Sequence, residues 1–375
     1  MRKSLYLALV TAVFFTAFPC FSCGEKAPKP SVGLEFTVSD DESYVEVTGM
    51  GDCEETAVVI PAKYEGLPVK AIGKKAFMGQ ENIKSVYLPN GIEKINAQAF
   101  SLCNSLEKVT LSSTLISIEY AAFYDCINLQ NFALPNGLVR VGDFSFRGCE
   151  KITKLSLPDS VKELDYGAFA ACTSLKTVKM SQSVEYMGTG VFSGCTSLES
   201  AEIPGTAKDL RDSIFYECTS LKRVKIGEGV DKIPESTFYH CTALEEIAWA
   251  ESVAVIENFA FLGCKSLTKL NFAEGLNGIA NRAFLGCNNL KEVYLPDSMV
   301  GMLNEAFFGC VNLEKLRIGR GLQEIGSLSF KGCSKLTEIS YNGTKGAWEE
   351  KNGFYNWSET GLNKVICTDG EIAIS

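Results

Sequence analysis

The sequence predicts a β-rich solenoid, a rod in which one short unit is stacked many times. Phenylalanine recurs every 23 residues from Phe77 to Phe330, twelve times without an insertion. A cysteine follows three residues later in eleven of these units, from Cys103 to Cys333. Apolar residues also recur at 3, 6, 8, 12 and 15 residues after each cysteine position. Self-similarity at such a period is the mark of a repeat architecture.

The unit is too short for a pair of packed helices, which needs about 33 residues or more. The apolar residues at positions 6 and 8, such as Val293 and Leu295, alternate as they do in a short strand. A proline or small residue and then Gly, Ser or Thr follow, and they mark a turn. We therefore expect one short strand per unit, with the strands stacked in parallel. The length and the L-x-x-V-x-L pattern are typical of leucine-rich repeats.

The full unit, C-x-x-L-x-x-V-x-L-P-x-x-L-x-x-I-g-x-x-A-F, resembles the BspA-like (Treponema-type) leucine-rich repeats of bacterial surface proteins. The resemblance covers about residues 34–370. It implies a surface adhesin that contacts host matrix proteins, other bacteria or glycans. Residues 44–69 look like the opening cap of that family, and residues 339–348 look like its closing cap.

The first 22 residues read as a signal peptide. Arg2 and Lys3 precede an apolar segment, residues 5–18, which is too short to span a bilayer. Ser22 directly before Cys23 resembles a lipoprotein cleavage site, so Cys23 is the expected lipid-attachment residue. Ordinary cleavage between Cys20 and Cys23 and an uncleaved anchor are the alternatives. Residues 23–33 would then form a polar lipid tether.

The remaining boundaries follow from the register of the repeat. Residues 34–75 are expected to form an N-terminal cap, a hairpin followed by a degenerate first repeat, and residues 76–338 the solenoid. Residues 339–375 are expected to close the far end, with 365–367 as the last strand. The bulky Trp348, Tyr355 and Trp357 would cover that end, or alternatively form a sugar-binding platform.

Composition excludes several classes of function. The formal net charge is −9, and removal of residues 1–22, which carry two cations and no acid, leaves −11; an acidic chain is a poor partner for nucleic acid. His240 is the single histidine and occupies a turn position that is often glycine. No catalytic or nucleotide-binding motif is present. We expect no enzyme activity, no metal and no cofactor.

Equivalent cysteines should stack into a column beside the phenylalanines. Metal or redox chemistry is one interpretation of this column. A small buried hydrophobe is the interpretation that the pattern favours, because no C-x-x-C spacing occurs within a repeat and parallel side chains suit disulfide geometry poorly. Cys53 and Cys367 lie in opposite caps and cannot pair within a monomer. So many free thiols in an exported protein suggest a reducing or anaerobic niche.

The candidate binding surface is the exposed side of the predicted strands, at positions 5 and 7 after the cysteine. These positions carry eight basic residues (108, 154, 179, 223, 225, 269, 315 and 317) and four acidic ones (202, 246, 292 and 338). From Arg223 onward the sign at position 5 alternates, which predicts a structural charge ladder. The net positive charge favours an acidic ligand, although lysine is also simply a soluble strand-surface residue. The expected ligand-binding residues are Lys179, Arg223, Lys225, Tyr87, Tyr294 and Arg317.

The sequence thus predicts a non-enzymatic cell-surface binding or adhesion protein, anchored by lipid in the envelope of a Gram-negative bacterium, at the outer membrane or cell surface. Its expected partner is a protein or glycan on a host or neighbouring cell, with membrane contact only through the anchor. A glycan-binding lipoprotein for nutrient capture and a structural envelope component are the alternatives.

Overall fold

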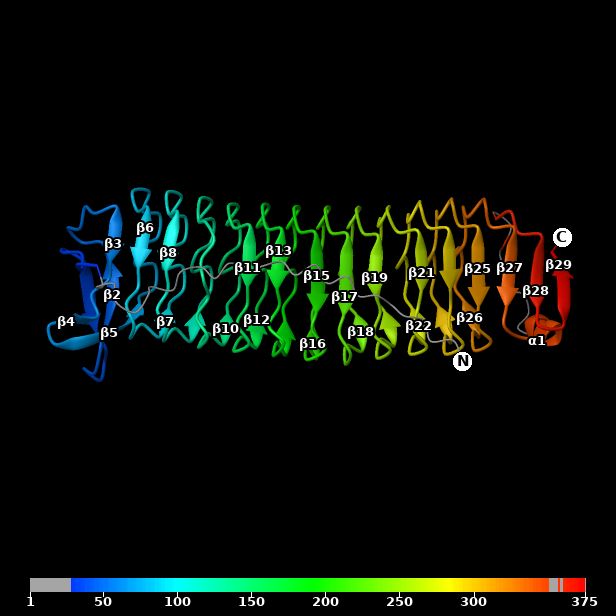
Figure 1. Ribbon diagram of the computed structural model, residues 1–375, viewed down its shortest axis with the longest axis horizontal. Helices are drawn as coiled ribbons and strands as arrows, with labels where there is room; N and C mark the ends of the chain where they lie inside the picture. Colours follow the sequence, from blue (N-terminus) through cyan, green and yellow to red (C-terminus); the bar gives the residue numbers. More distant parts are fainter. Residues whose placement is uncertain (1–27, 351–356, 358–359, 375) are drawn as a thin grey trace, which may run out of the picture.

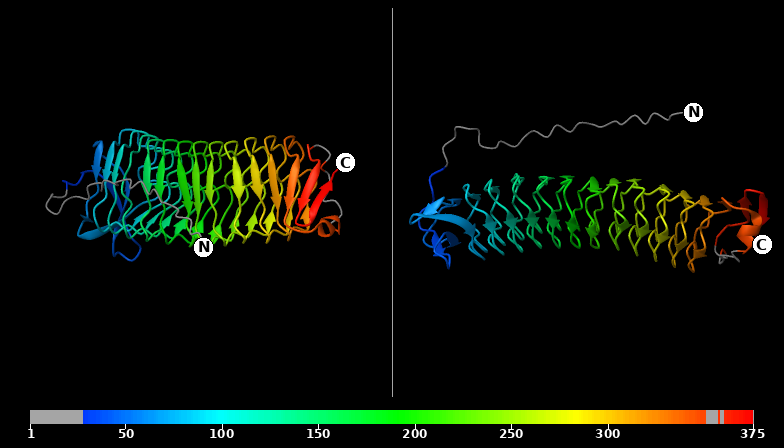
Figure 2. Two further views of the ribbon diagram at one scale, coloured as in Figure 1. Left: turned by 45° about the vertical axis from the view of Figure 1, so that its right-hand side comes forward. Right: turned by 90° about the horizontal axis from the view of Figure 1, so that it is seen from below.

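The protein is a long, gently curved rod of stacked turns with a cap at each end (Figures 1 and 2). The computed structural model describes residues 28–350, 357 and 360–374. The predicted signal peptide, residues 1–22, and the predicted lipid site, Cys23, lie outside the described residues. Within the described ranges, no helix is both long enough and apolar enough to cross a bilayer.

One parallel ladder of strands runs the length of the rod, and we call it the first ladder. Between residues 85 and 341 its strands pair with an offset of one repeat, so that Lys108 lies across from Ser85 and Arg223 from Ser200, whereas the offset is larger at the two caps. The ladder is divided into three sheets, because no strand is assigned at residues 131–133 and no pairing joins residues 246–248 to residues 269–271. The strands are β3 (Ala57–Val59), β6 (Ser85–Tyr87), β8 (Lys108–Thr110), β11 (Lys154–Ser156), β13 (Thr177–Lys179), β15 (Ser200–Ile203), β17 (Arg223–Ile226), β19 (Glu246–Ala248), β21 (Lys269–Asn271), β23 (Glu292–Tyr294), β25 (Lys315–Ile318), β27 (Glu338–Tyr341) and β28 (Lys364–Cys367).

A second parallel ladder, which the sequence did not predict, forms another wall. The expectation of one strand per unit is wrong, because residues 14 and 15 after the cysteine also pair between turns. Two residues are too few to show a recognisable alternation in a sequence. The strands are β5 (Leu67–Ile72), β7 (Lys94–Ile95), β9 (Ser117–Ile118), β10 (Arg140–Val141), β12 (Glu163–Leu164), β14 (Tyr186–Met187), β16 (Asp209–Leu210), β18 (Lys232–Ile233), β20 (Val255–Ile256), β22 (Gly278–Ile279), β24 (Gly301–Met302) and β26 (Glu324–Ile325).

The segment from two residues before each phenylalanine to its cysteine forms a third wall, which we call the turn wall. Its backbone groups bond to the next turn, as when the N–H of Phe77 donates to the carbonyl of Ala99 over 2.8 Å. The residue before each cysteine has positive φ, for example 72° at Gly286 and 53° at His240. This conformation explains the frequent glycine there. It also confirms the surface-turn position expected for His240.

The predicted columns form the core. Successive phenylalanine rings stack with centroids 5.0 to 5.7 Å apart. All eleven repeat cysteines are buried beside them. Continuous stacking of identical side chains buries each unit only against its neighbours, so the two ends need separate covers.

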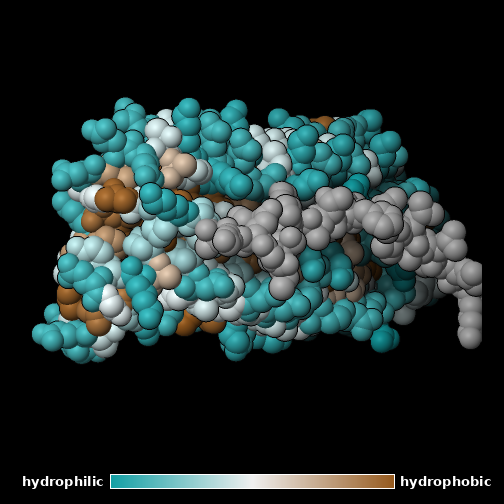
Figure 3. Space-filling model, turned by 60° about the vertical axis from the view of Figure 1, so that its left-hand side comes forward, coloured by the Kyte–Doolittle hydropathy of each residue, from teal (hydrophilic) through white to brown (hydrophobic). Residues whose placement is uncertain are grey.

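The N-terminal cover is the predicted hairpin. Strand β1 (Glu35–Val38) pairs antiparallel with β2 (Val45–Gly49), and β2 extends the second ladder by pairing in parallel with β5. The extra residues of the degenerate first repeat fold back as β4 (Lys63–Tyr64) against β5. This end carries apolar patches on a mostly hydrophilic surface (Figure 3), and Val38 and Tyr64 are among its exposed apolar side chains.

The C-terminal cover contains the helix α1 (Lys345–Glu350) and a second hairpin. Strand β28 was expected to be the last one, but β29 (Gly370–Ala373) follows it and pairs with it antiparallel. The ring of Trp357 stacks on Phe330, the last ring of the column, at 5.3 Å. Trp348 is buried against Tyr341. These contacts support a capping role for both tryptophans; Tyr355 lies outside the described residues.

Candidate binding surface

The candidate surface, here called the basic strip, consists of the side chains at positions 5 and 7 on the first ladder. They face solvent because the residue between them points into the core, as at Arg223, Val224 and Lys225. Of the predicted ligand-binding residues, Lys179, Arg223, Lys225 and Arg317 are exposed, and Tyr87 and Tyr294 are half-buried. All six lie on one ladder, spread from β6 to β25 rather than gathered in one site.

The C-terminal part of the strip is a ladder of ion pairs. Glu292 lies between two lysines, with its carboxylate 3.1 Å from Lys269 Nζ and 2.8 Å from Lys315 Nζ. Tyr294 donates its hydroxyl to the same carboxylate over 3.1 Å, and Lys269 lies over the Tyr294 ring. Hydrogen bonds from Lys315, Lys269 and Tyr294 lower the pKa of Glu292 to about 2. The predicted charge ladder is therefore present from Lys269 to Lys315, whereas Arg223 and Glu246, where it was expected to begin, form no ion pair among the described residues.

The middle of the strip is partly neutralised as well. Lys225 Nζ lies 2.8 Å from Glu202 Oε1 on the neighbouring strand β15. Lys179 is on β13, so β15 and its Glu202 separate Lys179 from Arg223 and Lys225. The expected cluster of three cations thus has an acid within it, and one of its members already has an ionic partner.

The N-terminal part is different, because it has cations and no acids. The ten strip positions from Ser85 to Lys179 include Lys108, Lys154 and Lys179 and neither Asp nor Glu. None of these three exposed lysines forms an ion pair within the described part of the chain. The uncompensated positive charge of the strip therefore lies mostly on this half.

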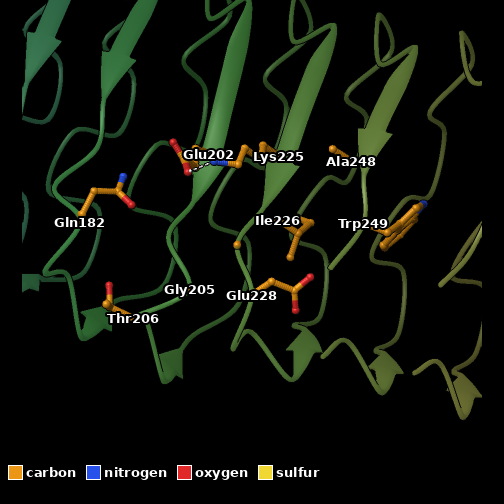
Figure 4. A pocket seen from close by; sticks show the side chains of 10 residues that line it. Gln182, Glu202, Gly205, Thr206, Lys225, Ile226, Glu228, Ala248 and Trp249 are labelled. Atoms are coloured by element: carbon orange, nitrogen blue, oxygen red, sulfur yellow. Dashed lines mark hydrogen bonds and ion pairs between the residues drawn. The ribbon is translucent and has the colours of Figure 1, made fainter. Parts of the chain in front are cut away.

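A hollow of about 620 Å³ opens beside the middle of the strip (Figure 4). Its edge includes the Glu202–Lys225 ion pair, and Trp249 stands at its other side. Trp249 takes a position that is aliphatic in most units, and Gly205 and Gly227 line the turn below it, where they allow adjacent turns to pack closely. The sequence analysis missed this hollow, although a bulky ring next to turn glycines was a usable signal.

The buried thiols of the cysteine column are poorly placed for nucleophilic or metal-binding chemistry. Each column thiol donates to the carbonyl oxygen of a phenylalanine in the preceding turn, as Cys103 does to Phe77 over 3.0 Å. Burial raises the pKa of the Cys103, Cys287 and Cys333 thiols to about 12. Thiols are nucleophiles and metal ligands only as thiolates. No cluster of three or more metal-ligating side chains occurs among the described residues. The burial and the hydrogen bonds of the thiols support the structural interpretation of the column.

Stacked 23-residue turns with short parallel strands define a leucine-rich repeat solenoid. The model of the BspA type leucine-rich repeat region matches residues 70–199, 168–287 and 254–364. Together these ranges span most of the chain, and the protein belongs to this family.

Solved structures that are similar to this chain come from several bacteria. A leucine-rich cell surface protein of Faecalibacterium prausnitzii is 24% identical, with 87% of this chain and 97% of that chain covered and a TM-score of 0.50. A leucine-rich repeat protein of Bacteroides ovatus is 22% identical over 90% and 98%, with a TM-score of 0.43. The leucine-rich repeat protein of Treponema pallidum is 27% identical over 58% and 90%, with a TM-score of 0.45. No curated protein matches the sequence.

Proposed function

We propose that this protein is a non-enzymatic binding protein of the bacterial cell surface, and that it holds an acidic protein ligand along the N-terminal half of the basic strip. The observation that supports this is the set of Lys108, Lys154 and Lys179, three exposed lysines without an ion pair among the described residues, within ten strip positions that carry no carboxylate. A row of cations one to two turns apart on a rigid, low-relief surface attracts a partner with a matching row of acids.

The location is part of the same proposal. Cys23 would carry the lipid that anchors the chain in the envelope, with residues 23–33 as the tether. The similar protein of Faecalibacterium is a cell surface protein, which supports exposure at the surface. In a Gram-negative cell this would place the solenoid on the outer membrane, where it could reach a host or neighbouring cell.

Among the described residues, the basic strip has no arrangement that favours catalysis. Three of the four strip carboxylates, those of Glu202, Glu292 and Glu338, are held in ion pairs with lysines. Acid–base chemistry on a glycosidic bond instead needs two carboxyl groups that converge across a cleft. The lone His240 stacks on Tyr239 in the turn wall, away from the strip. Binding therefore fits the geometry better than turnover.

The test uses the full chain, purified in detergent, on an array of matrix proteins and glycans. A strip variant, Lys108→Gln, Lys154→Gln and Lys179→Gln, removes three positive charges without adding an acid beside Glu202. The control variant, Lys75→Gln, Lys151→Gln and Lys265→Gln, removes the same charge from exposed positions outside the strip. We expect at least tenfold weaker binding to an acidic protein for the strip variant only. Equal binding by all three proteins would overturn the site.

A further inference from the structure

The turn wall contains a trough that the basic strip does not explain. It has a volume of about 370 Å³, which is within the range of small-molecule sites. Its floor is made of small residues from successive turns, among them Gly167, Ala170, Gly190 and Gly194. No strand of the first ladder contributes to it, so it is separate from the strip.

Glycine forms the floor in a position where other units have large side chains. The residue two before the phenylalanine has positive φ throughout, and it is Phe144, Arg282 or Leu328 elsewhere. At Gly190 an added Cβ would meet only Ser193, at 3.4 Å. The backbone conformation repeats in every unit, so the trough exists because glycine, rather than a large side chain, occupies this position in these turns.

Aromatic rings form the two end walls of the trough. Phe144 stands at one end and Tyr216 at the other, three turns apart, or roughly 15 Å at the spacing of stacked strands. Phe144 packs edge-on against Tyr166 at 4.7 Å, and Tyr216 stacks on Tyr239 at 4.7 Å. Neighbouring rings thus hold each wall in place before any ligand arrives.

The polar groups of the trough are mostly hydroxyls. Thr189, Ser193 and Ser213 line it, and their hydroxyl groups have no hydrogen-bond partner among the described residues. Arg147, whose guanidinium lies over the Phe144 ring at 5.4 Å, is the one charged side chain of the lining. No carboxylate is among the described residues that line the trough.

The floor backbone is already bonded. The N–H groups of Gly167, Gly190 and Gly194 donate to carbonyls of the next turn. An extended peptide that adds to a strand edge would need free backbone donors and acceptors. A sugar instead presents an apolar C–H face to an aromatic ring, and hydroxyls to side-chain hydroxyls and guanidinium groups.

We propose that this trough is a binding site for a short segment of a saccharide chain. A pyranose ring would lie on Phe144 or Tyr216, and its hydroxyls would bond to Thr189, Ser193, Ser213 and Arg147. The site gives the protein a second, glycan-directed contact on a different wall from the basic strip. It does not depend on the strip, because the two surfaces share no residue.

The repeat supplies variants that already fit each position. Gly190→Arg fills the trough with the residue that Arg282 represents in the same position. Leu328→Arg, in the same position six turns away, is its control. A wall variant, Phe144→Ser, Arg147→Ser and Tyr216→Ser, uses serine because Ser213, Ser101 and Ser193 occupy these positions elsewhere. Circular dichroism and thermal unfolding establish that each variant remains folded.

Binding of the full chain in detergent is measured on a broad glycan array and, in parallel, on a peptide array. Titration calorimetry with the best oligosaccharide then gives the affinity. We expect at least tenfold loss for Gly190→Arg and for the wall variant, with unchanged binding for Leu328→Arg and for the strip variant. The proposal is overturned if no glycan binds, or if the glycan binds Gly190→Arg as well as it binds the unmodified protein. Peptide binding that Gly190→Arg abolishes, without glycan binding, would also overturn it.

Discussion

The thiol of Cys126 donates a hydrogen bond to the carbonyl oxygen of Phe100, 3.0 Å away in the preceding turn. The same carbonyl also accepts the backbone N–H of Cys103. The bond recurs along the column, from Cys103 to Cys333. The cysteine is thus both a small buried side chain and a hydrogen-bond donor between turns. This double role explains why the same residue type recurs in this position.

A cavity variant tests this dual role. Cys218 is fully buried, and its Sγ lies 3.2 Å from the carbonyl oxygen of Phe192. Cys218→Ala removes a buried sulfur atom and leaves the carbonyl oxygen of Phe192 with one donor instead of two. We therefore expect a loss of about 1–2 kcal/mol in the free energy of unfolding. Urea denaturation followed by circular dichroism measures it. A change below about 0.3 kcal/mol would show that the bond contributes nothing.

The raised thiol pKa values predict a loss of stability at alkaline pH. An unfolded thiol ionises near pH 8.5, whereas burial holds the pKa of Cys103, Cys287 and Cys333 near 12. Their contribution is complete below the unfolded pKa and is lost as the pH rises towards the folded one. Replacing all three by alanine should flatten the decline between about pH 9 and 12, by up to about 1.4 kcal/mol per pH unit for each thiol. Urea unfolding across that range would show an unchanged slope if the thiols were solvated.

The charge ladder predicts a small effect in acid. Glu292 has its pKa lowered to about 2, so its contribution is present above its unfolded value, near 4.3, and disappears as the pH falls towards 2. The carboxylate is partly exposed and screened by solvent. We therefore expect Glu292→Gln to cost only about 0.5–1 kcal/mol at pH 7 and low salt.

The salt dependence provides the check on that variant. Because the pairs with Lys269 and Lys315 are accessible to ions, the difference between Glu292→Gln and the unmodified protein should shrink in 0.5 M NaCl. Thermal unfolding at the two ionic strengths measures the difference. A difference that is the same at both would attribute the effect to packing.

Trp357 predicts a local effect at the C-terminal end. Its ring covers Phe330, which otherwise ends the stack. Trp357→Ala should lower the protection of the last turn against hydrogen exchange, with little change at Phe192 and its neighbours, because each repeat contacts only adjacent ones. If protection at the last turn is unchanged while glycan binding falls, the sugar-platform interpretation would replace the capping one.

The repeat pattern determined how much of this structure could be predicted. Spacing alone placed Phe77 to Phe330 and the cysteines in stacked columns, because equal spacing forces equal positions. It also placed Glu202 and Lys225 one turn apart, so their ion pair could have been anticipated. The trough could not be anticipated in this way. It depends on Gly190 occupying the position that Phe144 and Leu328 occupy in other turns. It also depends on the glycine, the hydroxyl residues and the aromatic rings lying together on the turn wall.

The most direct test of the binding role is the ionic-strength dependence of binding to the best acidic protein found on the array. With the strip as the contact, the dissociation constant should rise steeply between 50 and about 300 mM NaCl. The slope should be shallower for Lys108→Gln, Lys154→Gln, Lys179→Gln and unchanged for the off-strip control. Identical slopes for all three proteins would contradict an electrostatic contact at this surface.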